Sequence, residues 1–273
     1  MTATLAIARY ELLIVRRNLW VAIAVGLMSL FGVVLTIAGS AAAGALGVDR
    51  LTVTVTSLTT LSVYLVPLIA LLLSFDAIAG ELERGTLALS LSYPISKAAF
   101  LIGKFIAHLI TLAAALGIGY GTAGLLSAWL GSTSTESLTA LVTLFASATL
   151  LGAAFLGLGY AVSGIVRQPG AAAGLVIGLW LVGVVLYDIG LLGALVADGG
   201  GAFTTKVFPW LLVANPADAF RIVNLAGSEA AALASGFSST QDALPTWAPL
   251  LAMALWPPAI LTIAWRLFRR IEA

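Results

Sequence analysis

The chain has 273 residues, of which 61% are hydrophobic and 9% are charged, and its net charge is +1. Because a soluble domain carries about 25% charged residues, this composition excludes an ordinary soluble fold and predicts a protein that lies in a lipid bilayer. The absence of cysteine excludes disulfides and thiolate metal sites, and the single histidine and three methionines argue against any metal site. We expect membrane lipid around the chain and no nucleic-acid partner.

The first predicted element is a helix over residues 4–18 that lies on the membrane surface. At about 100° per residue, Arg9, Arg16 and Arg17 share one face, with leucines and isoleucines elsewhere. Glu11 falls off that face and weakens the amphipathic pattern. The alternative is a cleaved export signal, but the apolar run that follows is longer than a usual signal core, and further spans come after it.

Six apolar stretches follow, each long enough to cross about 30 Å of hydrocarbon as a helix, which takes about 20 residues. The expected spans are 19–39, 58–75, 105–130, 138–166, 171–196 and 247–265. We therefore predict an all-α polytopic membrane protein in which residues 1–273 form a single transmembrane domain.

Lysine and arginine divide unequally between the two sides of this six-span plan. Three fall on one side, namely Arg50, Lys206 and Arg221. Ten fall on the other side: Arg9, Arg16, Arg17, Arg84, Lys97, Lys104, Arg167, Arg266, Arg269 and Arg270. Because cytoplasmic loops carry the excess of positive charge, we expect both termini and the loop at 76–104 to be cytoplasmic, in a bacterial inner membrane.

The loop at 76–104 is the longest charged interruption in the first two thirds of the chain. Glu81 and Glu83 suit the positive end of a helix dipole, and Gly85 permits a turn. Pro94 ends the helical run and pushes the preceding tyrosine towards extended geometry. We expect Lys97 and Lys104 to face the anionic inner leaflet. A solvated loop that only fixes the topology is the alternative interpretation.

This loop also carries a resemblance to a known family. The run Glu81-Leu-Glu83-Arg84-Gly85-Thr86-Leu87, with Ser92-Tyr93-Pro94-Ile95-Ser96-Lys97 after it, resembles the signature of ABC-2-type exporter permeases. The resemblance implies a cytoplasmic coupling helix that docks on a separate ABC ATPase, and two permease copies that enclose a path. It assigns the coupling to nine residues: Asp76, Glu81, Glu83, Arg84, Gly85, Thr86, Tyr93, Pro94 and Lys97.

Two further motifs resemble the branch of this family that serves the maturation of nitrous oxide reductase. One reads Val66-Pro67-Leu-Ile-Ala-Leu-Leu-Leu73 before Phe75-Asp76-Ala-Ile78, and the other reads Asn215-Pro-Ala-Asp-Ala-Phe-Arg221. The resemblance implies a NosF-like ATPase, a NosD-like periplasmic protein, and export of a sulfur species for the enzyme's copper–sulfur centre. This chain has Arg84 where the family has an acidic run before the glycine.

The segment at 187–246 is expected to form short outer helices before the last span. Asn215 as a cap and Pro216 at the first position predict a helix start, and Gly227 predicts a stop. The candidates for contact with an outer partner are Asn215, Asp218 and Arg221.

Two residues at the outer end of the fifth span, Tyr187 and Asp188, are candidates for a translocation path. A carboxylate inside an apolar run of a membrane protein is a functional candidate. The alternative is that Asp188 marks the end of the span and reaches water.

The sequence lacks nucleotide-binding and catalytic motifs. Gly103-Lys104-Phe105 has neither the glycine pattern nor the hydroxyl of a phosphate-binding loop. We therefore expect no cofactor and no enzymatic activity in this chain, with ATP and Mg²⁺ on the partner ATPase. His108 is expected to make a hydrogen bond between helices. Two other functions stay open: an ABC-2 exporter of a lipid, peptide or drug, and a non-transporting anchor that relays ATPase motion to a periplasmic partner.

Overall fold

The computed structural model describes residues 3–15, 19–46, 49–131, 133–225 and 244–271. All regular structure in these ranges is helical, which confirms the predicted all-α class. The elements are α1 (Ala3–Val15), α2 (Leu19–Leu46), α3 (Arg50–Ser74), α4 (Ala79–Glu83), α5 (Thr86–Ser92), α6 (Lys97–Leu130), α7 (Thr135–Ser163), α8 (Pro169–Trp180), the π-helix η1 (Leu181–Leu186), α9 (Tyr187–Asp198), the π-helix η2 (Phe203–Val207), α10 (Phe208–Ala214), α11 (Pro216–Leu225) and α13 (Ala248–Arg269).

Within the described ranges, six helical runs are long and apolar enough to cross a membrane. They are Leu19–Gly39, Arg50–Glu83, Lys97–Leu130, Thr135–Ser163, Pro169–Asp198 and Ala248–Arg269. Each overlaps one expected span, and the second and third begin well before their expected starts, at Arg50 instead of residue 58 and at Lys97 instead of residue 105. At the second, the Asp49 side chain accepts a hydrogen bond from the Thr52 backbone N–H at 2.8 Å and caps the helix there.

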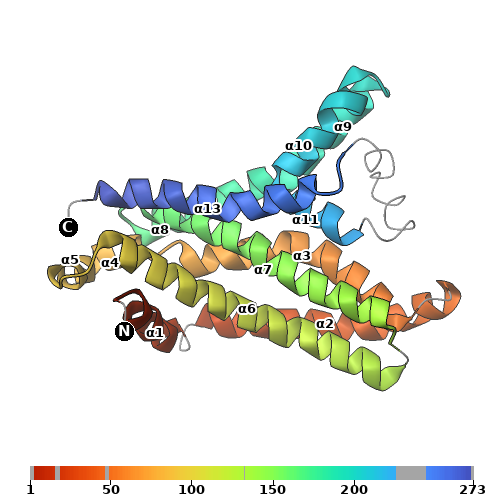
Figure 1. Cartoon of the computed structure of the whole chain (residues 1–273), viewed down its shortest axis with the longest axis horizontal. Helices are drawn as coiled ribbons and strands as arrows, with labels where there is room; N and C mark the ends of the chain where they lie inside the picture. The colour runs from red at the N-terminus through yellow and green to blue at the C-terminus, as the bar shows by residue number, and fades with distance from the viewer. Residues whose placement is uncertain (1–2, 16–18, 47–48, 132, 226–243, 272–273) are drawn as a thin grey trace.

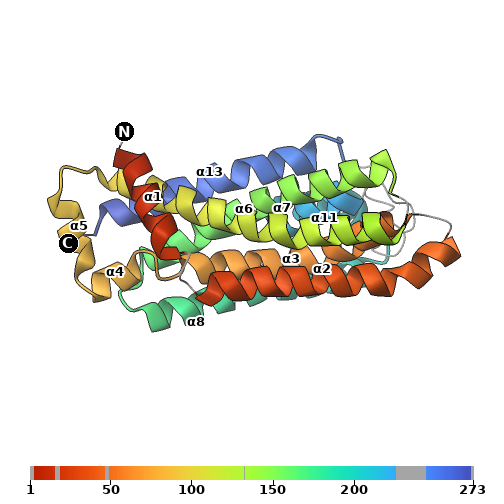
Figure 2. The same ribbon diagram turned by 90° about the horizontal axis from the view of Figure 1, so that it is seen from below.

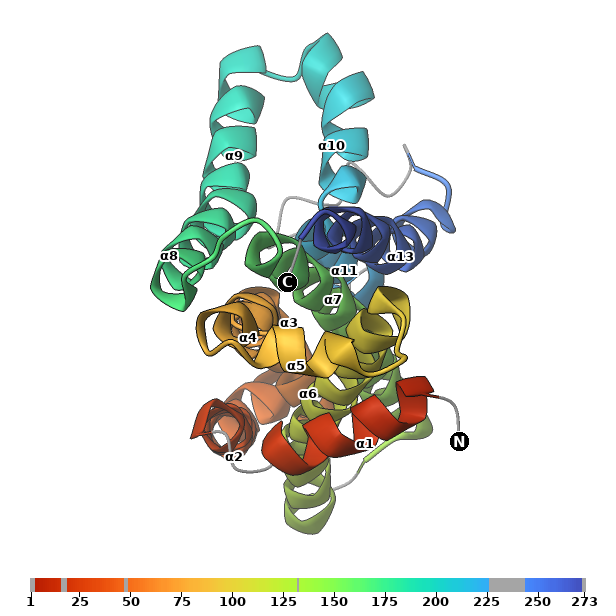
Figure 3. The ribbon, with the colours of Figure 1, turned by 90° about the vertical axis from the view of Figure 1, so that its left-hand side faces the viewer.

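The long helices lie side by side along one axis, and the short ones gather at its ends (Figures 1 and 2). Helix α1 crosses one end of the bundle, where α4 and α5 also lie, and both termini are at this end (Figures 1 and 3). We call it the α4–α5 end. At the opposite end, the Arg50 guanidinium donates to the Leu130 carbonyl at 3.1 Å. Helices α9 and α10 form a hairpin that stands away from the bundle (Figure 3).

Small residues set the spacing of the bundle. A methyl group added at Gly159 of α7 would overlap the Ser74 side chain of α3, and one at Gly119 of α6 would overlap Met28 of α2. Helices in lipid associate through such close contacts because there is no water to expel between them. Close backbone approach at Gly159 therefore helps to fix the position of α3 against α7.

The fifth span begins slightly earlier than expected. Its expected start is residue 171, whereas Pro169 opens α8 at its first position. A proline loses no hydrogen bond there, because the first N–H groups of a helix have no partner within it. The expected positions of Arg16, Arg17 and the stop at Gly227 lie outside the described residues.

Replacement of Asp49 is expected to loosen the opposite end of the bundle. The Asp49 carboxylate accepts from Thr52 in α3 and from the backbone N–H and hydroxyl of Ser134 before α7. Partial burial alone would raise its pKa, but these hydrogen bonds outweigh burial and lower the pKa to about 2. The stabilisation that these hydrogen bonds give the folded state is therefore present above about pH 4, which is the pKa of aspartate in the unfolded chain. It is lost as the pH falls towards 2, the pKa of Asp49 in the folded chain.

We predict that Asp49→Ala lowers the free energy of unfolding by about 1–2 kcal/mol at pH 7. The measurement is thermal unfolding in detergent between pH 7 and pH 2.5, with Glu136→Gln as a control at an exposed carboxylate of the same end. The difference between wild type and Asp49→Ala should shrink below pH 4. A difference that stays constant down to pH 2.5 would contradict the assignment.

Candidate functional site

The short helices α4 and α5 adopt the geometry that their sequence predicts. Gly85 separates them with φ 70°, in the left-handed region that favours glycine. Tyr93 is extended, with φ −75° and ψ 155°, and α5 ends directly before it. The side chains of Glu83, Arg84, Thr86 and Tyr93 are exposed, so this face of the segment is open for contact.

A hydroxyl from another helix holds the start of α4. Ser163, the last residue of α7, accepts hydrogen bonds from the backbone N–H groups of Ile78 and Ala79, both at 2.9 Å. These are donors at a helix start that have no partner within the helix. The role of Ser163 could not be predicted from the sequence, because its partners lie 85 and 84 residues away and the serine carries no local motif.

A buried ion cluster fastens α4 to α6 and α1. The Lys104 ammonium lies 2.6 Å from a Glu81 carboxylate oxygen and 2.9 Å from a Glu11 carboxylate oxygen. We expected Lys104 to face the inner leaflet, but it is only 4% exposed, because an ammonium that meets two carboxylates needs no lipid phosphate. An acid in a surface helix and a base inside an apolar helix were the signal that these charges could pair.

Lys97 makes contacts that the sequence did not predict. Its ammonium donates to the carbonyl oxygens of Ile271 at 2.6 Å and Arg269 at 3.4 Å. The carbonyls at a helix C-terminus have no partner within the helix and attract a cation. Lys97 therefore ties the start of α6 to the end of α13.

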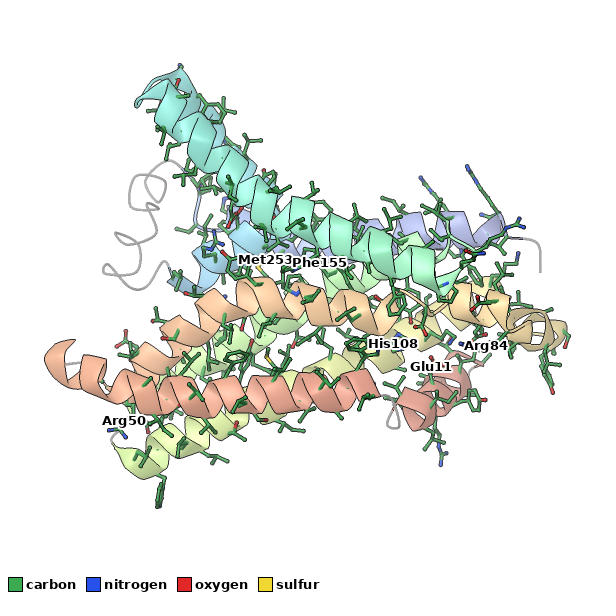
Figure 4. The ribbon with its side chains drawn as sticks, turned by 180° about the vertical axis from the view of Figure 1, so that it is seen from behind. Glu11, Arg50, Arg84, His108, Phe155 and Met253 are labelled. Carbon is green, nitrogen blue, oxygen red and sulfur yellow. The ribbon has the colours of Figure 1, made fainter. Side chains whose placement is uncertain are left out.

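His108 lies next to the ion cluster and makes the hydrogen bond between helices that we expected. Its Nδ1 is 2.6 Å from the Tyr160 hydroxyl of α7, and its Nε2 is 3.7 Å from the Glu11 carboxylate. Figure 4 labels Glu11, His108 and Arg84 at this end of the bundle, with Arg50 at the other. Within the described residues, no group of three or more His, Asp or Glu side chains is placed to hold a metal ion.

A second ion cluster joins residues to which the sequence assigns two different roles. The Arg221 guanidinium of α11 lies 2.8 Å from Asp188 of α9 and 2.8 Å from Asp218. Asp188 thus does not simply extend to water. This path candidate forms one cluster with two of the three outer-contact candidates, Asp218 and Arg221. Asp218 is fully buried, and burial together with the negative charge of Asp188 raises its pKa despite Arg221.

Asn215 and Tyr187 hold the hairpin to the rest of the chain. The Asn215 carbonyl oxygen accepts from the Ala217 N–H at 2.9 Å, which confirms the predicted cap of α11. Its amide donates to the Gly183 carbonyl in η1 at 2.7 Å. The Tyr187 hydroxyl donates to the Leu211 carbonyl in α10 at 2.7 Å. These two residues bound a cavity of about 400 Å³ whose other walls are mostly apolar, including Phe155 and Trp256.

Replacement of Lys104 tests the importance of the first ion cluster. Lys104→Met leaves two buried carboxylates without a cation, so we predict a loss of about 3–5 kcal/mol of stability. Glu11→Gln leaves one carboxylate for the ammonium, and its effect should be clearly smaller. Thermal unfolding of both variants in detergent is the measurement. Equal stability of Lys104→Met and wild type would contradict the cluster's structural role.

The comparisons with known proteins agree with this architecture. Residues 5–273 match the family described as ABC-2 family transporter protein. The chain is 43% identical over 270 residues to a protein of Pseudomonas aeruginosa named probable ABC transporter permease protein NosY, with 97% of each chain covered. It is 41% identical over 268 residues to a protein of the same name from Stutzerimonas stutzeri, again with 97% of each covered. The chain therefore belongs to the ABC-2 family of ABC transporter permeases.

Proposed function

We propose that this chain is the membrane subunit of an ABC transporter complex in which a separate, NosF-like ATPase binds and hydrolyses ATP. Two permease copies form a homodimer in the bacterial inner membrane, with both termini and the α4–α5 end in the cytoplasm. The excess of Lys and Arg at this end supports the orientation. The exposed side chains of Glu83, Arg84 and Tyr93 support a docking role for the α4–α5 segment.

The observation that carries the proposal is the way in which α4 is fastened to the spans. Ser163 of α7 caps the backbone at the start of α4. Lys104 of α6 forms an ion pair with Glu81, which lies in the middle of α4. The turn at Asp76 connects it to α3, where the Gly80 N–H donates to the Asp76 carbonyl at 2.8 Å. A displacement of α4 by an ATPase would therefore be passed to three spans together, because packed interiors move as units and do not deform continuously.

We further propose that the complex serves the assembly of the copper–sulfur centre of nitrous oxide reductase, by export of a sulfur species to the periplasm. The name of the relatives and the motifs at 66–78 and 215–221 support this role. A NosD-like periplasmic protein would bind near α10 and α11. The mostly apolar cavity beside Asn215 favours a second candidate, an ABC-2 exporter of an apolar cargo such as a lipid.

Docking of the ATPase can be tested by reversing one exposed charge. Glu83 is exposed on α4, whereas Glu81 is mostly buried in the ion cluster, so only Glu83 can be reversed without a cost to folding. We predict that Glu83→Lys lowers the amount of NosF-like ATPase that co-purifies from detergent by at least fivefold. Glu136→Lys, the same reversal at the opposite end, should retain the complex. Equal retention by both variants would move docking away from α4.

The outer cluster can be tested through maturation of the enzyme. Asp188→Asn keeps the shape of the side chain but removes one partner of Arg221. In a strain that depends on this chain, we predict loss of most of the copper–sulfur signal of nitrous oxide reductase, with unchanged amounts of permease in the membrane. A normal optical spectrum of the enzyme would rule out a role for Asp188 in the path.

A further inference from the structure

A second cavity lies at the α4–α5 end, between α1, α5 and α6. Its volume is about 470 Å³, and we call it the acidic slot. Its lining includes Tyr10 and Glu11 of α1, Glu81 of α4, Leu89 of α5, Tyr93, and Lys104 of α6. The slot is thus built from the surface helix, both short helices and a span, and it lies at the end of the bundle where the ATPase is expected.

The charges at the floor of the slot do not balance. Two carboxylates, Glu11 and Glu81, share the one Lys104 ammonium, which leaves one negative charge in excess. Each ion pair uses the Oε1 atom of its glutamate, and the buried Oε2 atom of Glu81 has no hydrogen-bond partner among the residues that the structure describes. A buried acceptor without a partner is costly. The slot is therefore complementary to a cationic donor.

The mouth of the slot suits a flat cation. Tyr10, Leu89 and Tyr93 are 66%, 65% and 63% exposed, so two aromatic rings and one aliphatic side chain stand open to solvent around an acidic floor. A guanidinium stacks on aromatic faces and donates to two acceptors at once, which an ammonium does less well. A lipid phosphate would meet repulsion from the same floor.

We propose that the acidic slot receives an arginine side chain of the ATPase subunit, and that the surface helix α1 thereby forms part of the ATPase-binding surface together with α4 and α5. This inference rests on the proposed function, because it takes the ATPase as the partner. The guanidinium enters between Tyr10 and Tyr93, and its N–H groups supply the positive charge that the pair of carboxylates lacks. The surface helix α1 then contacts the ATPase as well as the membrane surface.

The first experiment measures the affinity of the NosF-like ATPase for the permease in lipid nanodiscs. We expect Glu81→Gln, which removes the excess charge but keeps an oxygen for Lys104, to weaken binding at least tenfold, as desolvated charge pairs at interfaces do. Glu136→Gln, which removes one carboxylate at the opposite end, should bind within twofold of wild type. The melting temperature of each variant is measured alongside, so that loss of fold is recognised.

The second experiment identifies the ATPase residue that enters the slot, and it leaves Glu11, Glu81 and Lys104 unchanged. Because the chain has no cysteine, Leu89→Cys places a single benzophenone label at the mouth of the slot, and Ile165→Cys places one at an exposed control position between α7 and α8. Photo-crosslinking from position 89 should capture an ATPase peptide that contains an arginine. Replacement of that arginine by alanine should weaken binding as Glu81→Gln does, and the double variant should bind no more weakly than either single variant.

The outcomes separate the two proposals. If the wild-type permease binds no ATPase, the proposed function itself fails. If the complex forms but Glu81→Gln, while folded, binds as wild type does, the slot is not occupied by a cation. Crosslinks to lipid alone, a captured peptide without arginine, or additive effects of the two substitutions would each overturn the proposed arginine.

Discussion

The ammonium of Lys104, shared by Glu11 and Glu81, is the interaction on which the α4–α5 end depends. A buried charge costs several kcal/mol unless it is paired and hydrogen-bonded. Neither α1 nor α4 can leave its place without leaving a buried charge unpaired. The surface helix is thus bound to both α4 and α6 through this one ammonium.

The second cluster repeats this arrangement where α9 meets α11. There Arg221 is the cation and Asp188 and Asp218 are the carboxylates. In both places, three charges fix a peripheral element to a span, and in both the carboxylates outnumber the cation. The first cluster takes its charges from three helices, whereas in the second Asp218 and Arg221 lie one turn apart in α11. The apolar interior between them is held by close helix contacts, such as that of Gly159 with Ser74. A displacement of the helices at one end would therefore have to shift closely packed helices before it affected the other end.

Much of the fold can be predicted from the sequence, because its determinants are local. Apolar length gives the six spans, and Gly85, Pro94 and Asn215 mark turns and caps within a few residues of themselves. The pairing of Glu11 with Lys104 across 93 residues and the cap of α4 by Ser163 could not be predicted in the same way. Both depend on which helices become neighbours. Hydropathy does not predict this, because it does not distinguish one apolar helix from another as a packing partner. The start of the fifth span shows a smaller ambiguity. A proline in the sequence can stop a helix or occupy the first position of one, and Pro169 does the second.

The π-helical run Leu181–Leu186 has a consequence for how this chain can vary. A π segment holds more residues in each turn than an α-helix, so this run accommodates a residue that a continuous α-helix would not hold, and loss of one residue here would restore α geometry without turning the helix that follows. Loss of one residue from α8 or α9 before Asp188 would instead rotate everything after it by about 100°, and Asp188 would turn away from Arg221. The run Leu-Val-Gly-Val-Val-Leu consequently tolerates a change of length better than the α-helices on either side of it. In this part of the chain, the spacing between residues carries information that their apolar identities do not.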